Sequence, residues 1–212
     1  MNEPRHSVAH RSEADDDRLF APAAARNADA IVKALVPHLP KTGFVLEVAS
    51  GTGEHVIALA TQTPHLAWQP TEIDEERLKS IAAWIGYTGA TNVKPPRRYD
   101  AVQTPWPGPQ ANAVFLSNLL HLLSEADAMA LLANLSNALS PSGVLALYGP
   151  FKRGDAYASE GDERFDATIR AERPLAGYKS IDWVNGQCMK NGLTAVEQIS
   201  MPANNLMTLW QR

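Results

Sequence analysis

Glu47 and the small residues that follow it could bind a nucleotide-like ligand. An apolar segment at residues 44–48 contains Glu47, and residues 49–53 read Ala-Ser-Gly-Thr-Gly before a helical pattern begins. A strand that runs through glycine-rich backbone into a helix leaves free N–H groups at the carboxyl edge of a sheet. Gly51 and Gly53 have no side chain that would hold a ligand away from this backbone. The stretch therefore predicts a ligand-binding turn.

A second acid, Glu72, ends the next predicted strand at residues 65–72. Nucleotide-binding βαβ units place a ribose-binding carboxylate roughly 20 residues beyond the glycine turn. Its two acceptor oxygens suit the two hydroxyl donors of a cis-diol. Asp74, directly before a helical pattern, reads better as an N-cap. We therefore expect Glu72 to bind ribose.

The turn differs from two common phosphate-binding patterns. No Gly-Lys-Ser/Thr follows it, which excludes a P-loop. Val56 stands where a dinucleotide fingerprint starting at Gly51 would have its third glycine. A nicotinamide-dependent oxidoreductase is therefore a disfavoured alternative.

Strand and helix patterns alternate along most of the chain. Buried strands and amphipathic helices in this order predict an α/β fold with a seven-stranded, mostly parallel sheet and an antiparallel C-terminal strand. Pro95 and Pro96 restrict the third strand to an edge of the sheet. We expect helices at residues 20–38, 54–60, 75–87, 124–139 and 181–191, and strands at residues 44–48, 65–72, 92–100, 111–118, 144–148, 194–201 and 206–211.

The length of 212 residues suits one domain, which we place at residues 20–212 after a flexible tail at residues 1–19. Residues 149–179 are polar and loop-like, with one short helix expected at residues 164–171, and could form a lid or a substrate-side insertion. The formal net charge of −4 lacks the excess of positive charge that is typical of proteins that bind nucleic acid. The single cysteine suits a reducing compartment. We expect a cytoplasmic protein with no membrane segment.

The glycine turn resembles motif I of class I S-adenosylmethionine (SAM) methyltransferases, acid-x-small-x-Gly-x-Gly. This resemblance covers residues 20–212, and the final hairpin at residues 194–211 separates that fold from a dehydrogenase sheet. It implies a Rossmann-like three-layer sandwich that binds SAM and releases S-adenosylhomocysteine. Other matching features are Glu72, Asp100-Ala101, Asn118 and Pro141-x-Gly143.

A closer resemblance is to the methyltransferase-like protein 26 family. It implies the fold and SAM binding but no particular substrate. Glu72 departs from that pattern, which more often has Asp there. The matching sequence motifs are Ala24-Ala25-Arg26-Asn27, the turn from Glu47 to His55, Trp68-Gln-Pro-Thr-Glu-Ile-Asp74, Tyr148-Gly-Pro-Phe-Lys-Arg153, Phe165-Asp166 and Met201-Pro-Ala-Asn-Asn205.

The resemblance implies roles for individual residues, with a packing or capping role as the alternative for each. Glu47 would meet the methionyl ammonium, Glu72 the ribose, and Asp100 with Ala101 the adenine. His121 or Tyr148 could accept a proton from the methyl acceptor. No metal ligands are expected. The expected cofactor-binding residues are Glu47, Ala49, Ser50, Gly51, Gly53, Glu72, Ile73, Asp100, Ala101 and Asn118, and the expected substrate-binding residues are Arg26, Asn27, His55, Phe151, Arg153, Asn204 and Asn205.

The leading hypothesis is therefore methyl transfer from SAM to a small molecule or a protein side chain. Nucleic acid is disfavoured because Ser117-Asn118-Leu119-Leu120 lacks the Asn/Asp-Pro-Pro-aromatic word that grips a flipped base. A SAM-binding sensor or scaffold without turnover is the main alternative. The sequence predicts no oligomeric state.

Overall fold

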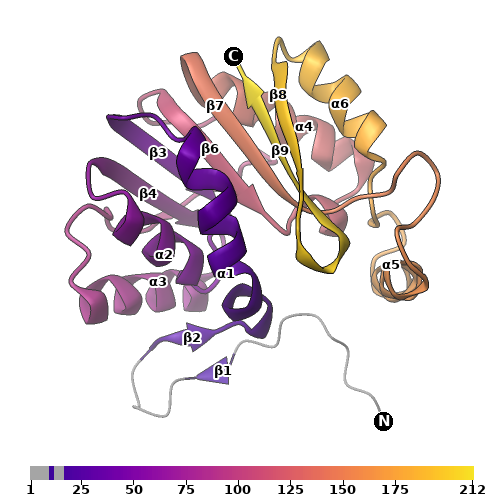
Figure 1. Ribbon diagram of the computed structural model, residues 1–212. Coiled ribbons are helices and arrows are strands. Elements are labelled where there is room, and N and C mark those ends of the chain that lie inside the picture. The colour runs from indigo at the N-terminus through magenta and orange to yellow at the C-terminus, as the bar shows by residue number, and fades with distance from the viewer. Residues whose placement is uncertain (1–9, 12–16) are drawn as a thin grey trace. The chain divides into compact units, whose positions relative to one another are not determined.

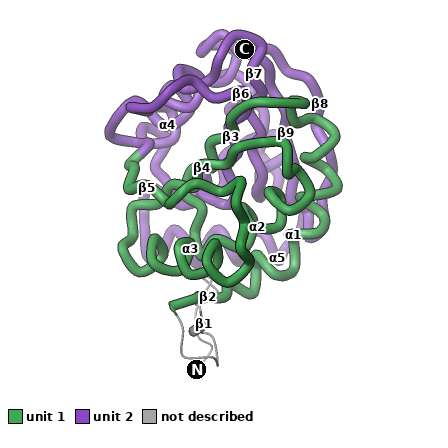
Figure 2. The backbone as a smooth tube through the Cα atoms, turned by 90° about the vertical axis from the view of Figure 1, so that its left-hand side faces the viewer, with its two compact units in different colours: residues 1–100 green, residues 101–212 purple. Residues whose placement is uncertain are grey.

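The computed structural model describes residues 10–11 and 17–212 of the chain (Figure 1). Most of the predicted tail, residues 1–9 and 12–16, lies outside the described residues. The chain divides into two compact units, residues 1–100 and residues 101–212 (Figure 2).

The main sheet has seven strands. They are β3 Gly43–Val48, β4 Leu66–Glu72, β5 Arg97–Arg98, β6 Ala111–Ser117, β7 Leu139–Pro150, β8 Thr194–Ser200 and β9 Asn205–Gln211. Their order is β5-β4-β3-β6-β7-β9-β8. β9 runs antiparallel to both β7 and β8, while the β3–β4, β4–β5 and β6–β7 pairs are parallel. The predicted fold class is confirmed, including the edge position of β5.

In unit 1, the helices are α1 Pro22–Leu35, α2 Glu54–Gln62 and α3 Glu75–Thr88, with a 3-10 turn η1 Val36–His38 after α1. The two-residue strands β1 His10–Arg11 and β2 Leu19–Phe20 pair antiparallel. Val45 of β3 lies opposite Trp68 of β4, and both side chains are fully buried. Helices α2 and α3 both contact β4, and α1 contacts α2. The core of this unit therefore fixes the carboxyl ends of β3 and β4 next to each other.

The local chemistry of unit 1 explains where its helices begin. Gly53 precedes α2 with a left-handed φ of 99°, which favours glycine. Asp74 caps α3, as predicted, because its side chain accepts a hydrogen bond from the N–H of Arg77. Pro70 lies inside β4, two residues before its end, opposite Glu47.

Unit 2 contains the helices α4 Glu125–Ala138, α5 Glu160–Glu172 and α6 Ile181–Lys190, and the 3-10 turns η2 Leu120–Leu122 and η3 Pro202–Asn204. Strand β7 begins at Leu139, before the predicted start at residue 144, and its pairing with β6 shifts register between Leu139 and Val144. A Cβ on Gly143 would lie 2.8 Å from the main-chain oxygen of Ser140, so only glycine fits there. Figure 1 shows β8 and β9 as a hairpin beside β7.

Residues 149–179 are more ordered than their polar sequence indicates. Helix α5 spans residues 160–172, longer than the predicted helix at residues 164–171. Ser159 caps it by accepting a hydrogen bond from the N–H of Asp162. Phe165 and Ile169 of α5 pack in a cluster with Tyr178. The segment contains one helix, as expected, and this helix is longer than predicted because α5 has both a cap and an apolar face.

Candidate functional site

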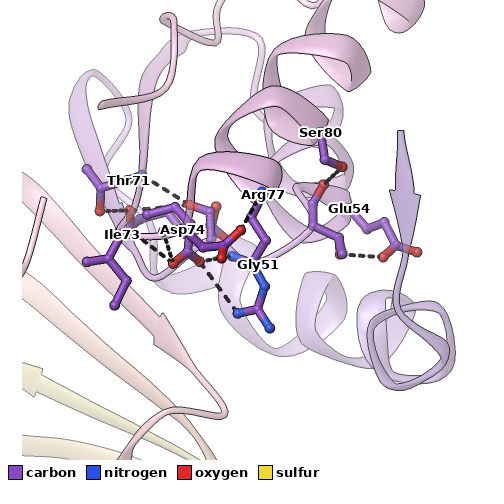
Figure 3. Close-up of polar contacts among 11 residues, drawn as sticks. Gly51, Glu54, Thr71, Ile73, Asp74, Arg77 and Ser80 are labelled. Carbon is purple, nitrogen blue, oxygen red and sulfur yellow. Dashed lines mark hydrogen bonds and ion pairs between the residues drawn. The ribbon is translucent and has the colours of Figure 1, made fainter. Parts of the chain in front are cut away.

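Glu72 connects the end of β4 to the glycine turn (Figure 3). Its Oε2 atom accepts a hydrogen bond from the N–H of Gly51 at 2.9 Å, and its Oε1 atom accepts one from the N–H of Ile73 at 2.8 Å. The guanidinium of Arg77 lies 4.0 Å from Oε2. A carboxylate has about four acceptor positions. Oε1 also accepts a longer hydrogen bond from the N–H of Asp74 at 3.4 Å, so the capacity for a ligand hydroxyl lies on Oε2. The side chain is held in place and remains able to accept hydrogen bonds.

Glu47 is the one side chain with buried oxygens that lack a hydrogen-bond partner in the part of the chain that the structure describes. It is 1% exposed, and neither carboxyl oxygen has a partner. Burial raises the pKa of Glu47 to about 8, the Ser50 hydroxyl acts in the opposite direction, and the charge of Glu72 adds to the rise. A buried acid without partners is costly, and a cationic ligand group would remove that cost.

The glycine turn itself combines an open and a packed position. Ala49, Gly51 and Gly53 have φ values of 54°, 60° and 99°. A Cβ on Gly51 would meet nothing within 4 Å, whereas a Cβ on Gly53 would lie 3.1 Å from the Cα of Ile81. The N–H of Ser50 donates to the main-chain oxygen of Thr71 at 2.8 Å, which fixes the start of the turn. Gly51 is therefore the position that leaves room for a ligand.

Asn27 and His55, both predicted to face the substrate, contact each other in unit 1. Nε2 of His55 lies 2.7 Å from Oδ1 of Asn27. Burial lowers the pKa of His55 to about 4, so its ring is neutral at pH 7. Since the amide oxygen only accepts, Nε2 carries the proton. Arg26, one residue earlier on α1, is exposed. The pair joins α1 to α2 directly after the glycine turn.

Sequence reasoning missed Thr52, Glu54 and Ser80, which surround the turn. Oε2 of Glu54 accepts a hydrogen bond from the Thr52 hydroxyl at 2.7 Å, and the Ser80 hydroxyl donates to the main-chain oxygen of Thr52 at 2.8 Å (Figure 3). Glu54 could have been found from the sequence, because an acidic residue at the first position of a helix is favoured by the helix dipole. Nothing in the sequence marks Ser80.

In unit 2, the predicted residues Asn118 and His121 follow the end of β6, and Tyr148 lies near the end of β7. Asn118 has a φ of 53° and its N–H donates to the main-chain oxygen of Tyr148 at 2.8 Å. His121 lies in η2 and is 6% exposed. Its ring centroid is 5.9 Å from that of Tyr178 and 6.0 Å from that of Phe165. The structure thus brings Asn118 and Tyr148 together and packs His121 against the aromatic cluster beside α5.

The remaining predicted substrate residues form a polar network in unit 2. Arg153 donates to the main-chain oxygen of Phe151 at 2.6 Å and to that of Asn204 at 3.0 Å. The Asn204 amide donates to Oδ2 of Asp162 at 3.0 Å. The Asn205 amide donates to the main-chain oxygen of Pro202 at 3.0 Å. Phe151 is buried, so its role in this structure is packing.

Asp166 is a fully buried acid that the sequence left without a role. Its carboxylate accepts hydrogen bonds from the Tyr157 hydroxyl at 2.6 Å, Nε of Arg170 at 2.8 Å and the N–H of Tyr178 at 2.5 Å. These bonds outweigh burial and lower the pKa of Asp166. Lys179 donates from Nζ to the main-chain oxygens of Leu123 and Gly177, both at 2.7 Å. Together these contacts anchor residues 157–179 beside η2.

Asp100 is the last residue of unit 1 and Ala101 the first residue of unit 2. The main-chain oxygen of Ala101 accepts a hydrogen bond from the Asn134 amide at 2.8 Å. Among the described residues, no group of three or more His, Cys, Asp or Glu side chains could hold a metal ion. Within the same part of the chain, no helix combines the length and hydrophobicity needed to cross a membrane.

The sequence model of the family described as "Protein of unknown function (DUF938)" matches residues 18–212. The chain belongs to the DUF938 family. The matched range includes the glycine turn, the acidic residues Glu47 and Glu72, and all the residues of the unit 2 networks.

Solved structures share the fold of this DUF938 chain. A putative O-methyltransferase from Nostoc punctiforme has a TM-score of 0.79 and 18% identity, over 90% of this chain and 57% of that one. An O-methyltransferase family 2 protein from Planctomyces limnophilus, in complex with apigenin, has a TM-score of 0.77 and 20% identity, over 90% and 60%. Human N-acetylserotonin methyltransferase, in complex with SAM, has a TM-score of 0.75 and 12% identity, over 90% and 52%.

These likenesses establish that the DUF938 chain has the Rossmann-like fold of methyltransferases. The chain matches only 52% to 60% of the length of those three proteins. The shared fold does not assign the ligands and reactions of those three proteins to this chain.

Proposed function

We propose that this protein is a SAM-dependent methyltransferase whose cofactor binds at the glycine turn of unit 1. The observation that carries the proposal is the buried Glu47 carboxyl without a hydrogen-bond partner among the described residues. The methionyl end of SAM has an ammonium group, and a cation beside Glu47 would pair with its charged form. The methyltransferase fold and the sequence resemblance support the same assignment.

Three parts of unit 1 would hold the cofactor. Backbone around Ser50, Gly51 and Gly53 would receive the methionyl end, where Gly51 has open space for a Cβ-sized group. Glu72 would accept a hydrogen bond from a ribose hydroxyl with the acceptor position of Oε2 that Gly51 leaves unused. Ile73, 52% exposed beside Glu72, offers apolar surface. Ala49, Asp100, Ala101 and Asn118 remain predicted cofactor residues from the sequence resemblance.

The sulfonium of bound SAM supplies an activated methyl group, so the protein has to orient the acceptor, exclude water and remove a proton. We assign proton removal to His121, with Tyr148 as the second candidate. The aromatic contacts of His121 with Phe165 and Tyr178 would keep its ring in one orientation. Arg26, Asn27, His55, Phe151, Arg153, Asn204 and Asn205 remain predicted substrate-side residues.

The acceptor is a small molecule in this proposal, with a protein side chain as the second choice. The net charge of −4 disfavours nucleic acid. The structural neighbours include a complex with apigenin and an N-acetylserotonin methyltransferase, both concerned with small molecules. The resemblance to the methyltransferase-like protein 26 family and a cytoplasmic location belong to the same proposal.

Thermal melting tests the cofactor assignment with SAM, S-adenosylhomocysteine, NAD or no ligand. The wild type should gain about 2.7 kcal/mol from either SAM or its product at one hundred times the dissociation constant, and nothing from NAD. Glu72→Gln should lose most of that gain. Glu76→Gln, which removes an exposed charge nearby, should keep it. A wild-type protein that neither SAM nor its product stabilises would refute the proposal.

A further inference from the structure

Two side chains hold Thr52, which lies between the two glycines of the turn, at two different atoms. The Ser80 hydroxyl, which is fully buried in α3, donates to the main-chain oxygen of Thr52 at 2.8 Å. Oε2 of Glu54, at the start of α2, accepts a hydrogen bond from the Thr52 hydroxyl at 2.7 Å. Figure 3 shows Ser80 and Glu54 among these contacts. The turn is therefore fixed from both helices that follow it.

The same two side chains also bind residues 18–21, which we call the strap. The N–H of Leu19 donates to Oγ of Ser80 at 2.8 Å. The N–H of Ala21 donates to Oε2 of Glu54 at 2.8 Å. Two hydrogen-bonded relays therefore run from the strap through one side chain each to Thr52.

The strap is firmly docked on α3. Arg18 is 7% exposed, and its guanidinium carbon lies 3.5 Å from the ring centroid of Tyr87 and 5.0 Å from that of Trp84. The Trp84 indole donates to the main-chain oxygen of Leu19 at 3.1 Å. The Phe20 ring packs edge-on against Trp84, with centroids 5.0 Å apart. These contacts give the strap a fixed position from which the relays can act.

We propose that the strap sets the glycine turn in its ligand-binding conformation, with Ser80 and Glu54 as positioning residues for SAM. The proposal rests on the proposed function, because the ligand at the turn is the SAM of that site. A turn with two glycines loses much backbone freedom when it is ordered. Ordering the turn before SAM arrives removes that loss from the binding step. The family match begins at Arg18, so the strap lies within it.

The test compares Ser80→Ala with Ser136→Ala. Ser136 is a matched control because it is 3% exposed and donates one hydrogen bond, at 2.8 Å, to the main-chain oxygen of Asn191 in unit 2. The readouts are SAM affinity by calorimetry below the melting temperature, and hydrogen exchange of the Gly51 and Gly53 amides without ligand. Ser80→Ala should weaken SAM binding about tenfold and speed both exchange rates about tenfold. Ser136→Ala should change neither.

Substitution of Glu54 provides a rescue. One oxygen, Oε2, accepts both hydrogen bonds, so Glu54→Gln can keep them, whereas Glu54→Ala cannot. We expect wild-type affinity from the first variant and the Ser80→Ala behaviour from the second. Equal affinity and equal exchange in Ser80→Ala and Ser136→Ala would overturn the role of the strap. If the wild type does not bind SAM, the proposed function fails, and amide exchange alone decides whether the strap orders the turn.

Discussion

Oε2 of Glu72 accepts a hydrogen bond from the N–H of Gly51 at 2.9 Å, across 21 residues of sequence. The bond joins the end of β4 to the turn after β3. The acid assigned to ribose and the turn assigned to the methionyl end of SAM therefore form one hydrogen-bonded unit. A ligand that binds there meets groups whose positions are already set, which lowers the entropy lost on binding.

Glu47 should make the stability of the fold depend on pH. Its pKa is about 8 in the folded chain and near the ordinary 4.5 in the unfolded chain. Between these values the folded chain keeps a proton that the unfolded chain has lost, so the free energy of unfolding falls as pH rises. His55 acts in the opposite direction, with its folded pKa near 4 instead of 6.5, but mostly below pH 6.5. Between pH 6.5 and 8 the loss from Glu47 therefore outweighs the remaining gain from His55.

Urea unfolding should show this loss directly. The Glu47 contribution should decrease by about 2 kcal/mol between pH 6.5 and 8. Glu47→Gln has no proton to lose and should have a correspondingly flatter profile. Identical pH profiles of the two proteins would show that the carboxyl is not buried in a charge-excluding environment.

Gly53 and Gly86 should respond in opposite ways to alanine. Gly53 has a φ of 99°, and a Cβ there would lie 3.1 Å from the backbone of Ile81. Gly53→Ala should therefore destabilise the protein by about 2 kcal/mol. Gly86 lies inside α3 with nothing within 4 Å of an added Cβ, so Gly86→Ala should stabilise by roughly 0.5–1 kcal/mol. Chemical denaturation measures both changes, and a harmless Gly53→Ala would contradict the packing of the turn on α3.

Asp166 should be essential for the anchoring of α5. Asp166→Asn replaces one acceptor oxygen by a donor in front of the Tyr157 hydroxyl and the Arg170 guanidinium. The loss should be about 2 kcal/mol, because both donors lose a charged acceptor that is itself fully buried. Glu163→Gln, at an exposed position of the same helix, should change stability little. Equal melting temperatures of the two variants would argue against the network.

His121 should be needed for turnover and not for cofactor binding. His121→Gln should lower the rate of S-adenosylhomocysteine formation about a hundredfold or more on a panel of phenolic acceptors. Its SAM affinity should match that of the wild type. Tyr148→Phe provides the comparison that separates the two proton acceptors. Wild-type turnover by His121→Gln would move the catalytic role away from this residue.

Much of the fold follows from local sequence signals. The glycine turn, the Asp74 cap and the proline pair before β5 each act within a few residues, so the alternation of strands and helices was predictable. The start of β7 was not predictable in this way. Pro141-Ser142-Gly143 is a turn signal, and Ser142 has a left-handed φ of 62°. The residues on either side of it pair with β6, so the turn is an irregularity inside a longer strand.

The contacts around the candidate site depend on residues far apart in the sequence. Ser80 contacts Thr52 across 28 residues, and Lys179 contacts Leu123 across 56. No pattern within either segment indicates these partners. Residues 149–179 read as a loop for the same reason, since the buried partners of Asp166 appear only when the chain is folded. Arg18 and Leu19, placed in the tail from their polar surroundings, pack on α3.

The most direct test of the account is calorimetric titration of SAM into the wild type and Glu47→Gln at pH 6.5, in two buffers with different ionisation enthalpies. At this pH Glu47 holds a proton, which must leave when the carboxylate pairs with the ammonium of SAM. We expect the wild type to bind SAM with release of about one proton, and Glu47→Gln to bind it more weakly and without proton release. Absence of SAM binding by the wild type, or binding with the same proton release in both proteins, would contradict it.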